Sequence, residues 1–337
     1  MQRKFIDSDS VTLQQLKQAY ERLEGFPVDK SHGFFHELVR FMDFVETDSH
    51  LGGICLTLRN SSRRIATEID KLIGDAKTSD PPRFNYIGST TRRDVIEGAK
   101  TTEELAIQGY AVLSKITKDN DQGLIYKIED YILEELDHRQ HRKYFQKTFL
   151  EPFYHHLCLN VEYEQSTITV LLRCKEILEL KADYLLSQYR SNTQRGELVL
   201  SKEFQQVLLS MQRVEFAIAP TSPSGKIDIV GSINSKKNLL AEFKVFDGSK
   251  SRVAQWYSQI RDYLCNYSQS LGYLIIFNVC GDKELCFSFD DTADSGIKAF
   301  RRGGRTVYFL VVDIEQQETA SVRIRKPIVI GEQDLIR

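Results

Sequence analysis

Apolar residues in the first 190 positions recur at intervals of three or four, which is the period of an amphipathic helix. Leu13, Leu16, Tyr20 and Leu23 form the first such set, behind a Ser or Thr that can cap the helix. The same spacing predicts further helices over residues 33–45, 61–73, 101–116, 124–149 and 168–189. We therefore predict a mostly helical domain over residues 1–190.

A polar segment without periodicity, residues 190–196, separates this half from a second one with a different pattern. Short apolar runs, typical of strands, then alternate with helical patterns. Strands are predicted near 213–219, 226–231, 239–246, 272–279 and 306–314, and helices near 197–212 and 251–268. The last two strands are almost entirely apolar, as central strands covered on both faces are. We predict an α/β domain at 196–337, with a central mixed sheet flanked by helices, in a chain that is α+β overall.

Two consecutive predicted strands carry charged residues that interrupt an apolar pattern. Asp228 lies between two isoleucines, while Glu242 and Lys244 share one face of the following strand. If the two strands pair, the three side chains converge on one edge. Two carboxylates beside a lysine are the groups that metal-assisted phosphodiester hydrolysis uses. An edge hairpin with outward charges is the alternative, but it does not explain why Asp228 interrupts an apolar strand.

The composition narrows the class of protein. The 337 residues are 41% hydrophobic and 27% charged, which suits a globular protein with a sizeable core and excludes the membrane class. The net charge of −2 gives no overall attraction to nucleic acid, so such binding requires a local basic surface. No apolar run approaches the ~20 residues of a membrane span.

The expected compartment follows from the start of the chain and from its cysteines. The basic residues near the start precede no apolar stretch, so we expect no signal peptide. The six cysteines are scattered and form no C-x-x-C pair, as free thiols in a reducing cytosol do. We expect a cytoplasmic protein without a membrane partner.

A glutamine and a tyrosine on the helix after the charged strands extend the pattern. Gln259 and Tyr263 are four residues apart and therefore share a helix face. The series Asp228, Glu242-Phe243-Lys244, Gln259 and Tyr263 resembles the motifs of the PD-(D/E)xK nuclease superfamily. The resemblance covers roughly residues 196–315, and an isoleucine stands where that family often has proline before the aspartate. It implies a restriction-endonuclease-like fold for this domain.

The resemblance also implies a role for each position. Asp228, Glu242 and the backbone carbonyl of Phe243 would bind Mg²⁺ or Mn²⁺, which prefer oxygen ligands. Lys244 would orient the attacking water or stabilise the charge that develops on the phosphate. Gln259 would steady Lys244 or the phosphate, which completes the expected catalytic set.

Further residues near this set are candidates for weaker roles. The preceding helix offers an additional acidic metal ligand, Glu203 or, with less support, Glu197. Contacts to the nucleic acid are expected from the residues that flank the motif: Lys250, Arg252, Arg261 and Tyr263.

These expectations combine into a metal-dependent nuclease that hydrolyses phosphodiester bonds of DNA, with RNA left open. A nuclease domain attached to an unrelated helical domain resembles effectors of prokaryotic anti-phage defence or restriction, and this part rests on analogy. The helical domain would then recognise, regulate, form a homo-oligomer or bind a partner protein. The alternative is a non-cleaving subunit that binds nucleic acid or acts as a scaffold while keeping the nuclease fold.

Overall fold

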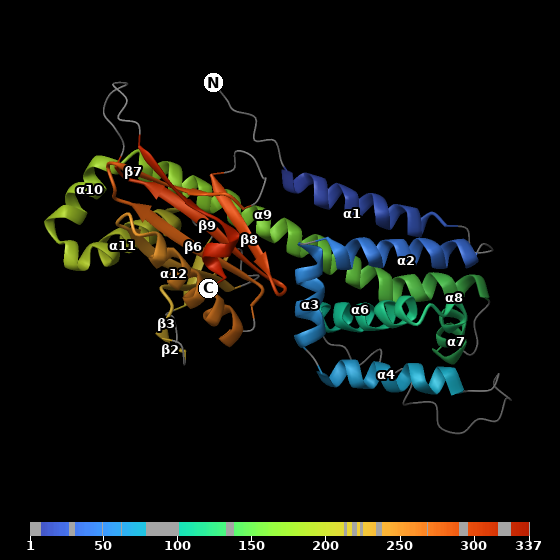
Figure 1. Cartoon of the computed structure of the whole chain (residues 1–337). Coiled ribbons are helices and arrows are strands. Elements are labelled where there is room, and N and C mark those ends of the chain that lie inside the picture. The colour runs from blue at the N-terminus through green and yellow to red at the C-terminus, as the bar shows by residue number, and fades with distance from the viewer. Residues whose placement is uncertain are drawn as a thin grey trace. The chain divides into compact units, whose positions relative to one another are not determined.

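The chain divides into two compact units, Met1–Tyr163 and Glu164–Arg337, each of which we describe by itself (Figure 1). The computed structural model describes residues 8–26, 31–48, 50–61, 63–78, 101–132, 138–211, 214–217, 221–222, 225–233, 238–267, 269–289, 296–315 and 325–336. Among these residues, no helix is long and apolar enough to cross a membrane.

The first unit is helical, as predicted. Its elements are α1 (Ser8–Glu24), α2 (Ser31–Thr47), α3 (Leu51–Ser61), α4 (Arg63–Thr78), α6 (Thr102–Lys118), α7 (Gln122–Ile132), α8 (His138–Phe145), the π-helical turn η1 (Gln146–Leu150) and the start of α9 (Glu151–Glu179). Part of the helix predicted over 124–149, residues 133–137, lies outside the described residues. Thr101 caps α6 by accepting from the backbone of Glu104, whose side chain accepts from Thr101 in turn.

Helix α3 was not predicted from the sequence. Its pair Gly52-Gly53 lowers the intrinsic helix propensity. The Asp48 side chain offsets this at the first turn by accepting from the backbone N–H groups of His50 and Leu51, at 2.9 and 2.8 Å. Apolar residues of α3, including Ile54 and Leu58, are buried in the core of the unit. Tertiary packing therefore decides the conformation where propensity is weak.

The second unit is built on a mixed sheet. Its helices are the rest of α9, α10 (Ala182–Ser191), the 3₁₀ turn η2 (Thr193–Arg195), α11 (Gly196–Ser210), α12 (Lys250–Asn266) and α13 (Glu332–Leu335). Its main strands are β1 (Val214–Ala217), β4 (Ile229–Ile233), β5 (Asn238–Phe246), β6 (Leu271–Asn278), β8 (Ile297–Arg302) and β9 (Arg305–Asp313). In the described residues they form a six-stranded sheet in the order β1-β4-β5-β6-β9-β8, in which β5, β6 and β9 are parallel.

Smaller strands complete the second unit. Strands β2 (Thr221–Ser222) and β3 (Gly225–Lys226) form an antiparallel pair, and β7 (Lys283–Phe287) pairs in parallel with β10 (Lys326–Ile330). The α+β class and the central mixed sheet flanked by helices are therefore confirmed. The predicted strand at 213–219 is described over β1, and its other residues lie outside the described ones.

Strand β5 is buried on both faces, and alternate side chains face different helices. Phe243 packs on Phe204 of α11 and on Phe277 of β6, with ring centroids 5.2 and 6.1 Å apart. Leu240 and Phe246 belong instead to the core that includes Ile260 of α12. The connection β5-α12-β6 joins two parallel neighbouring strands, so α12 lies against the sheet. Even-numbered residues of β5 consequently face α12.

The division of the chain differs from the boundary expected at 190–196. The C-terminal half of α9 belongs with the sheet because its side chains bond to residues of strand β9. Glu164 accepts a hydrogen bond from Tyr308, and Glu179 accepts one from the backbone N–H of Asp313 at 2.9 Å. In α10, Arg190 pairs with Glu315 at 2.8 Å. A polar sequence segment therefore marks a turn within this unit rather than its edge.

Two truncated fragments test this division. We expect fragment 164–337 to unfold in one cooperative transition, whereas fragment 196–337 should be much less stable or unfolded. The shorter fragment lacks the helix residues that bond to Tyr308 and Asp313, and the apolar sheet surface beneath them becomes exposed. Chemical denaturation followed by circular dichroism measures both fragments. Equal stability of the two would place the boundary at 196 after all.

Candidate active site

The site lies where β4 stops pairing with β5. The ladder between the two strands runs from Ser232 opposite Asn238 to Ile229 opposite Ala241. Beyond that point the backbone N–H of Phe243 donates to the Asp228 carboxylate at 2.8 Å. Asp228 thus takes the place that the next strand residue would have in the ladder. It precedes β4 instead of lying inside the strand predicted at 226–231, because its side chain replaces a backbone hydrogen bond.

Glu242 is the most buried charged group of the site. Its side chain is 2% exposed and lies between the sheet and α12. One carboxylate oxygen, Oε1, accepts from Lys244 Nζ and from Gln259 Nε2, both at 2.8 Å. Gln259 Nε2 also donates to the hydroxyl of Tyr263 at 2.9 Å. The structure therefore brings together Asp228, Glu242, Lys244 and Gln259, as the sequence predicted.

The second oxygen of Glu242, Oε2, is buried and has no hydrogen-bond partner in the described part of the chain. Burial, and next the nearby charge of Asp228, raise the pKa of Glu242 from 4.5 to about 7. A buried carboxylate oxygen without a donor is costly to ionise. Raised pKa values of this kind are concentrated at functional sites, which makes Glu242 the central residue of the candidate site.

Lys244 is held in its charged form. Burial lowers its pKa, but the carboxylates of Glu242, Glu197 and Asp228 together raise the pKa above its ordinary value. The side chain is 12% exposed, so the ammonium group is largely shielded from solvent while it stays close to the surface. A fixed, partly desolvated positive charge interacts strongly with an anion that approaches it.

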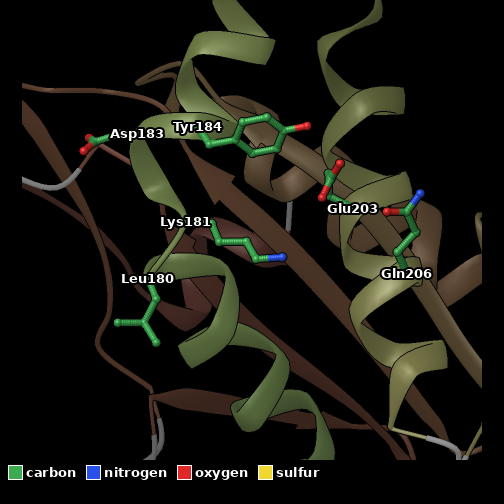
Figure 2. A pocket seen from close by; sticks show the side chains of 6 residues that line it. All are labelled: Leu180, Lys181, Asp183, Tyr184, Glu203 and Gln206. Atoms are coloured by element: carbon green, nitrogen blue, oxygen red, sulfur yellow. The ribbon is translucent and has the colours of Figure 1, made fainter.

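The acidic residue of the preceding helix is Glu197. Its Oε1 lies 3.6 Å from Lys244 Nζ, and burial raises its pKa, with Asp228 adding to the rise. Glu203 instead lines a separate groove with Lys181, Tyr184 and other residues of α10, α11 and the turn before α10 (Figure 2). The two glutamates are six residues apart on α11, which places them on different faces of the helix. Helical spacing from Phe204, which contacts Phe243, could have favoured Glu197.

The residues predicted to contact nucleic acid are not equally available. Tyr263 is 1% exposed, and its hydroxyl accepts from Gln259, so it supports the site and presents no surface to a ligand. Lys250 pairs with Asp334 at 2.8 Å, and Arg252 pairs with Asp247. Arg261 is exposed and lies 3.5 Å from Asp262. Of these four, Arg261 has the weakest ion pair and the greatest freedom to meet a phosphate.

Comparison with known proteins identifies no relative: no family model, no curated protein and no solved structure matches the chain. Among the residues that the structure describes, no group of three His, Cys, Asp or Glu side chains is arranged to hold a metal ion. A cation at this site would therefore use two side-chain carboxylates together with backbone or water oxygens, as Mg²⁺ commonly does.

The raised pKa of Glu242 predicts a pH dependence of stability in metal-free protein. The folded state binds a proton more tightly than the unfolded state, so stability falls as pH rises from 4.5 to about 7. At ~1.4 kcal/mol per pKa unit, the loss is roughly 2–3 kcal/mol. Glu242→Gln removes this dependence. Denaturation in EDTA at several pH values should show that the free energy of unfolding of the variant rises relative to that of the wild type above pH ~5. If stability depends on pH in the same way in both proteins, the raised pKa of Glu242 is contradicted.

Proposed function

We propose that the chain is a metal-dependent nuclease that hydrolyses phosphodiester bonds of DNA. The observation that supports this most is the convergence of Asp228, Glu242 and Lys244 at the open edge of β5. Two carboxylates at one point repel a phosphate unless a cation neutralises them. A purely structural role does not require them to meet in this way, since either alone could cap the strand.

The residues fit a divalent cation with oxygen ligands. Glu242 Oε2 is a buried anionic oxygen without a donor in the described residues, and Asp228 acts on it electrostatically. Asp228 bonds to the N–H of Phe243, and the N–H and C=O of one strand residue point to the same side. The carbonyl of Phe243 therefore faces the same edge. Asp228, Glu242 and this carbonyl would hold Mg²⁺ or Mn²⁺, which supplies Lewis acidity that activates water and offsets phosphate charge.

The remaining groups act on the substrate and on the carboxylates. Lys244 keeps a positive charge beside the scissile phosphate and stabilises the negative charge that develops there. Gln259 donates to Glu242 Oε1 and to Tyr263. It therefore fixes the carboxylate that also accepts a hydrogen bond from Lys244. The sequence predicted that Gln259 steadies Lys244 or the phosphate. Its contacts support a role in positioning Glu242.

The biological setting of this activity is the broadest part of the proposal. We infer a role in prokaryotic defence against foreign DNA, in which the helical first unit recognises, regulates or oligomerises. A non-cleaving DNA-binding subunit is the competing function. The cationic Lys244 and Glu242 Oε2, which has no hydrogen-bond partner among the residues that the structure describes, favour hydrolysis, because a binding surface gains nothing from a buried carboxylate with a raised pKa.

Cleavage assays with three substitutions test the proposed site. We expect wild-type protein to cleave DNA with Mg²⁺ or Mn²⁺ and not with EDTA. Asp228→Ala, Glu242→Ala and Lys244→Ala should each lower the rate by roughly 10²–10³, the usual loss when a group that stabilises the transition state is removed. Glu203→Ala is the matched control, because Glu203 lines another groove (Figure 2). Cleavage that survives all three substitutions would refute the site, and binding without cleavage under every metal would support the competing function.

Gln259→Ala separates positioning from packing. The variant loses one hydrogen bond to a charged group, worth about 1.5–3 kcal/mol, so kcat should fall roughly 10–100-fold while KM stays near the wild-type value. The half-buried Gln259 adds little to the core, and Lys244 still bonds to Glu242. Melting temperature and steady-state kinetics measure the two effects. A large loss of melting temperature with normal turnover would assign Gln259 a structural role only.

A further inference from the structure

A second groove adjoins the candidate site at the end of β5. It has a volume of about 280 Å³ and lies among η2, the start of α11, the end of β5 and the first turns of α12. Glu197, which lies 3.6 Å from Lys244, belongs to its lining. Val245, which follows Lys244 along the strand, belongs to the lining too. We call this hollow the flanking groove, because a chain passing the candidate site at Lys244 would reach it next.

Two aromatic rings line the flanking groove. Tyr189 of α10 lies against Gly196, where an added Cβ would come within 2.3 Å of the ring. The close approach favours glycine at this position and limits the movement of the ring on that side. Trp256 of α12 is 9% exposed, so its indole is fixed by packing and shows one small part to the groove. Rigid aromatic rings at a groove wall suit the stacking of a planar group.

The polar groups of the flanking groove suit a nucleobase better than a phosphate. Gln194 and Gln255 are exposed amides, each of which offers a donor and an acceptor. Asp247 and Glu197 are acidic, and Arg252 pairs with Asp247. Carboxylates repel phosphate oxygens but accept hydrogen bonds from the amino groups of bases. The groove therefore has the Tyr189 ring and a small exposed part of the Trp256 indole beside amide and carboxylate groups for base edges.

We propose that the flanking groove binds the base of an unpaired nucleotide next to the scissile phosphate, so that single-stranded DNA is the preferred substrate. This rests on the proposed nuclease function of the adjoining site. A base can enter a groove with aromatic residues in its lining when it is unstacked, which is ordinary in single strands and costs energy in a duplex. Stacking of this kind tolerates any base, so the groove selects for strandedness rather than for sequence.

The chain contains a single tryptophan, Trp256, and it lines the flanking groove. Its fluorescence therefore reports occupancy directly and without cleavage. The full chain is titrated with Ca²⁺ present, which offsets the charge of the carboxylates, using a single-stranded oligodeoxynucleotide and, in parallel, a blunt duplex of the same sequence. We expect saturable quenching by the single strand and little change with the duplex. Equal quenching by both, or none by the single strand, would overturn the proposal.

Two variants locate the effect. Gln255→Ala should weaken the binding of the single strand by roughly 2–10-fold, the value of one net hydrogen bond. Tyr189→Ala removes a stacking ring and should weaken it by roughly 5–150-fold. Gln206→Ala is the matched control for Gln255, because both are exposed helix glutamines and Gln206 lines the other groove (Figure 2). If Gln206→Ala weakens binding as much as Gln255→Ala, the base does not lie in the flanking groove.

The result is independent of the nuclease assay. Quenching by the single strand without cleavage under any metal would leave the flanking groove as a binding site and refute the nuclease function. Cleavage without quenching would support the nuclease function and refute the binding of a base in the flanking groove. Where both occur, Gln255→Ala should raise KM for single-stranded DNA and leave kcat unchanged, since Gln255 makes no hydrogen bond to the site carboxylates within the described part of the chain and acts only on binding. A fall in kcat alone would contradict the proposal.

Discussion

The second unit depends on placing one carboxylate, that of Glu242, between a β-sheet and a helix. Burial raises its pKa to about 7, so ionisation in this place costs stability. The unit tolerates this loss of stability because β5 is otherwise packed through apolar residues on both faces, including Leu240 and Phe246 on the same face as Glu242. Gln259 and Lys244 satisfy one oxygen and leave the other without a donor in the described residues. The surrounding core thus keeps Glu242 partly protonated near pH 7, where a glutamate in water would be ionised.

The alternation of side chains along β5 links this group to the rest of the unit. Glu242 faces α12, whereas the next residue, Phe243, packs on Phe204 of α11. The ring contact sets where α11 lies, and its first turn carries Glu197 to within 3.6 Å of Lys244. A strand that is buried on both faces therefore brings polar groups of both helices to the site, Glu197 from α11 and Gln259 from α12. A register shift of one residue would turn Glu242 and Lys244 to the other face of the strand, and the site would no longer form.

Much of the arrangement of the candidate site could be predicted from the sequence, because it depends on local patterns. Alternation placed Glu242 and Lys244 on one face, and helical spacing placed Gln259 with Tyr263. What was missed depends on contacts between residues that are distant in sequence. The bonds from Glu164 and Glu179 to β9 and its end, which extend the second unit back to 164, have no local signal. For Glu197, helical spacing from Phe204 gives the helix face, but the approach to Lys244 depends on how α11 packs.

The open edge of β5 explains why the candidate site and the flanking groove adjoin. Pairing with β4 ends opposite Ala241, and Asp228 takes over the N–H of Phe243, so the strand residues beyond have no antiparallel neighbour among the described residues. Lys244 and Val245 follow within a few ångströms of chain, since a strand advances about 3.3 Å per residue. An edge left unpaired in this way is normally a liability that invites association with another strand. Here carboxylates and a lysine line it, which disfavours strand pairing and leaves the edge accessible to a charged chain.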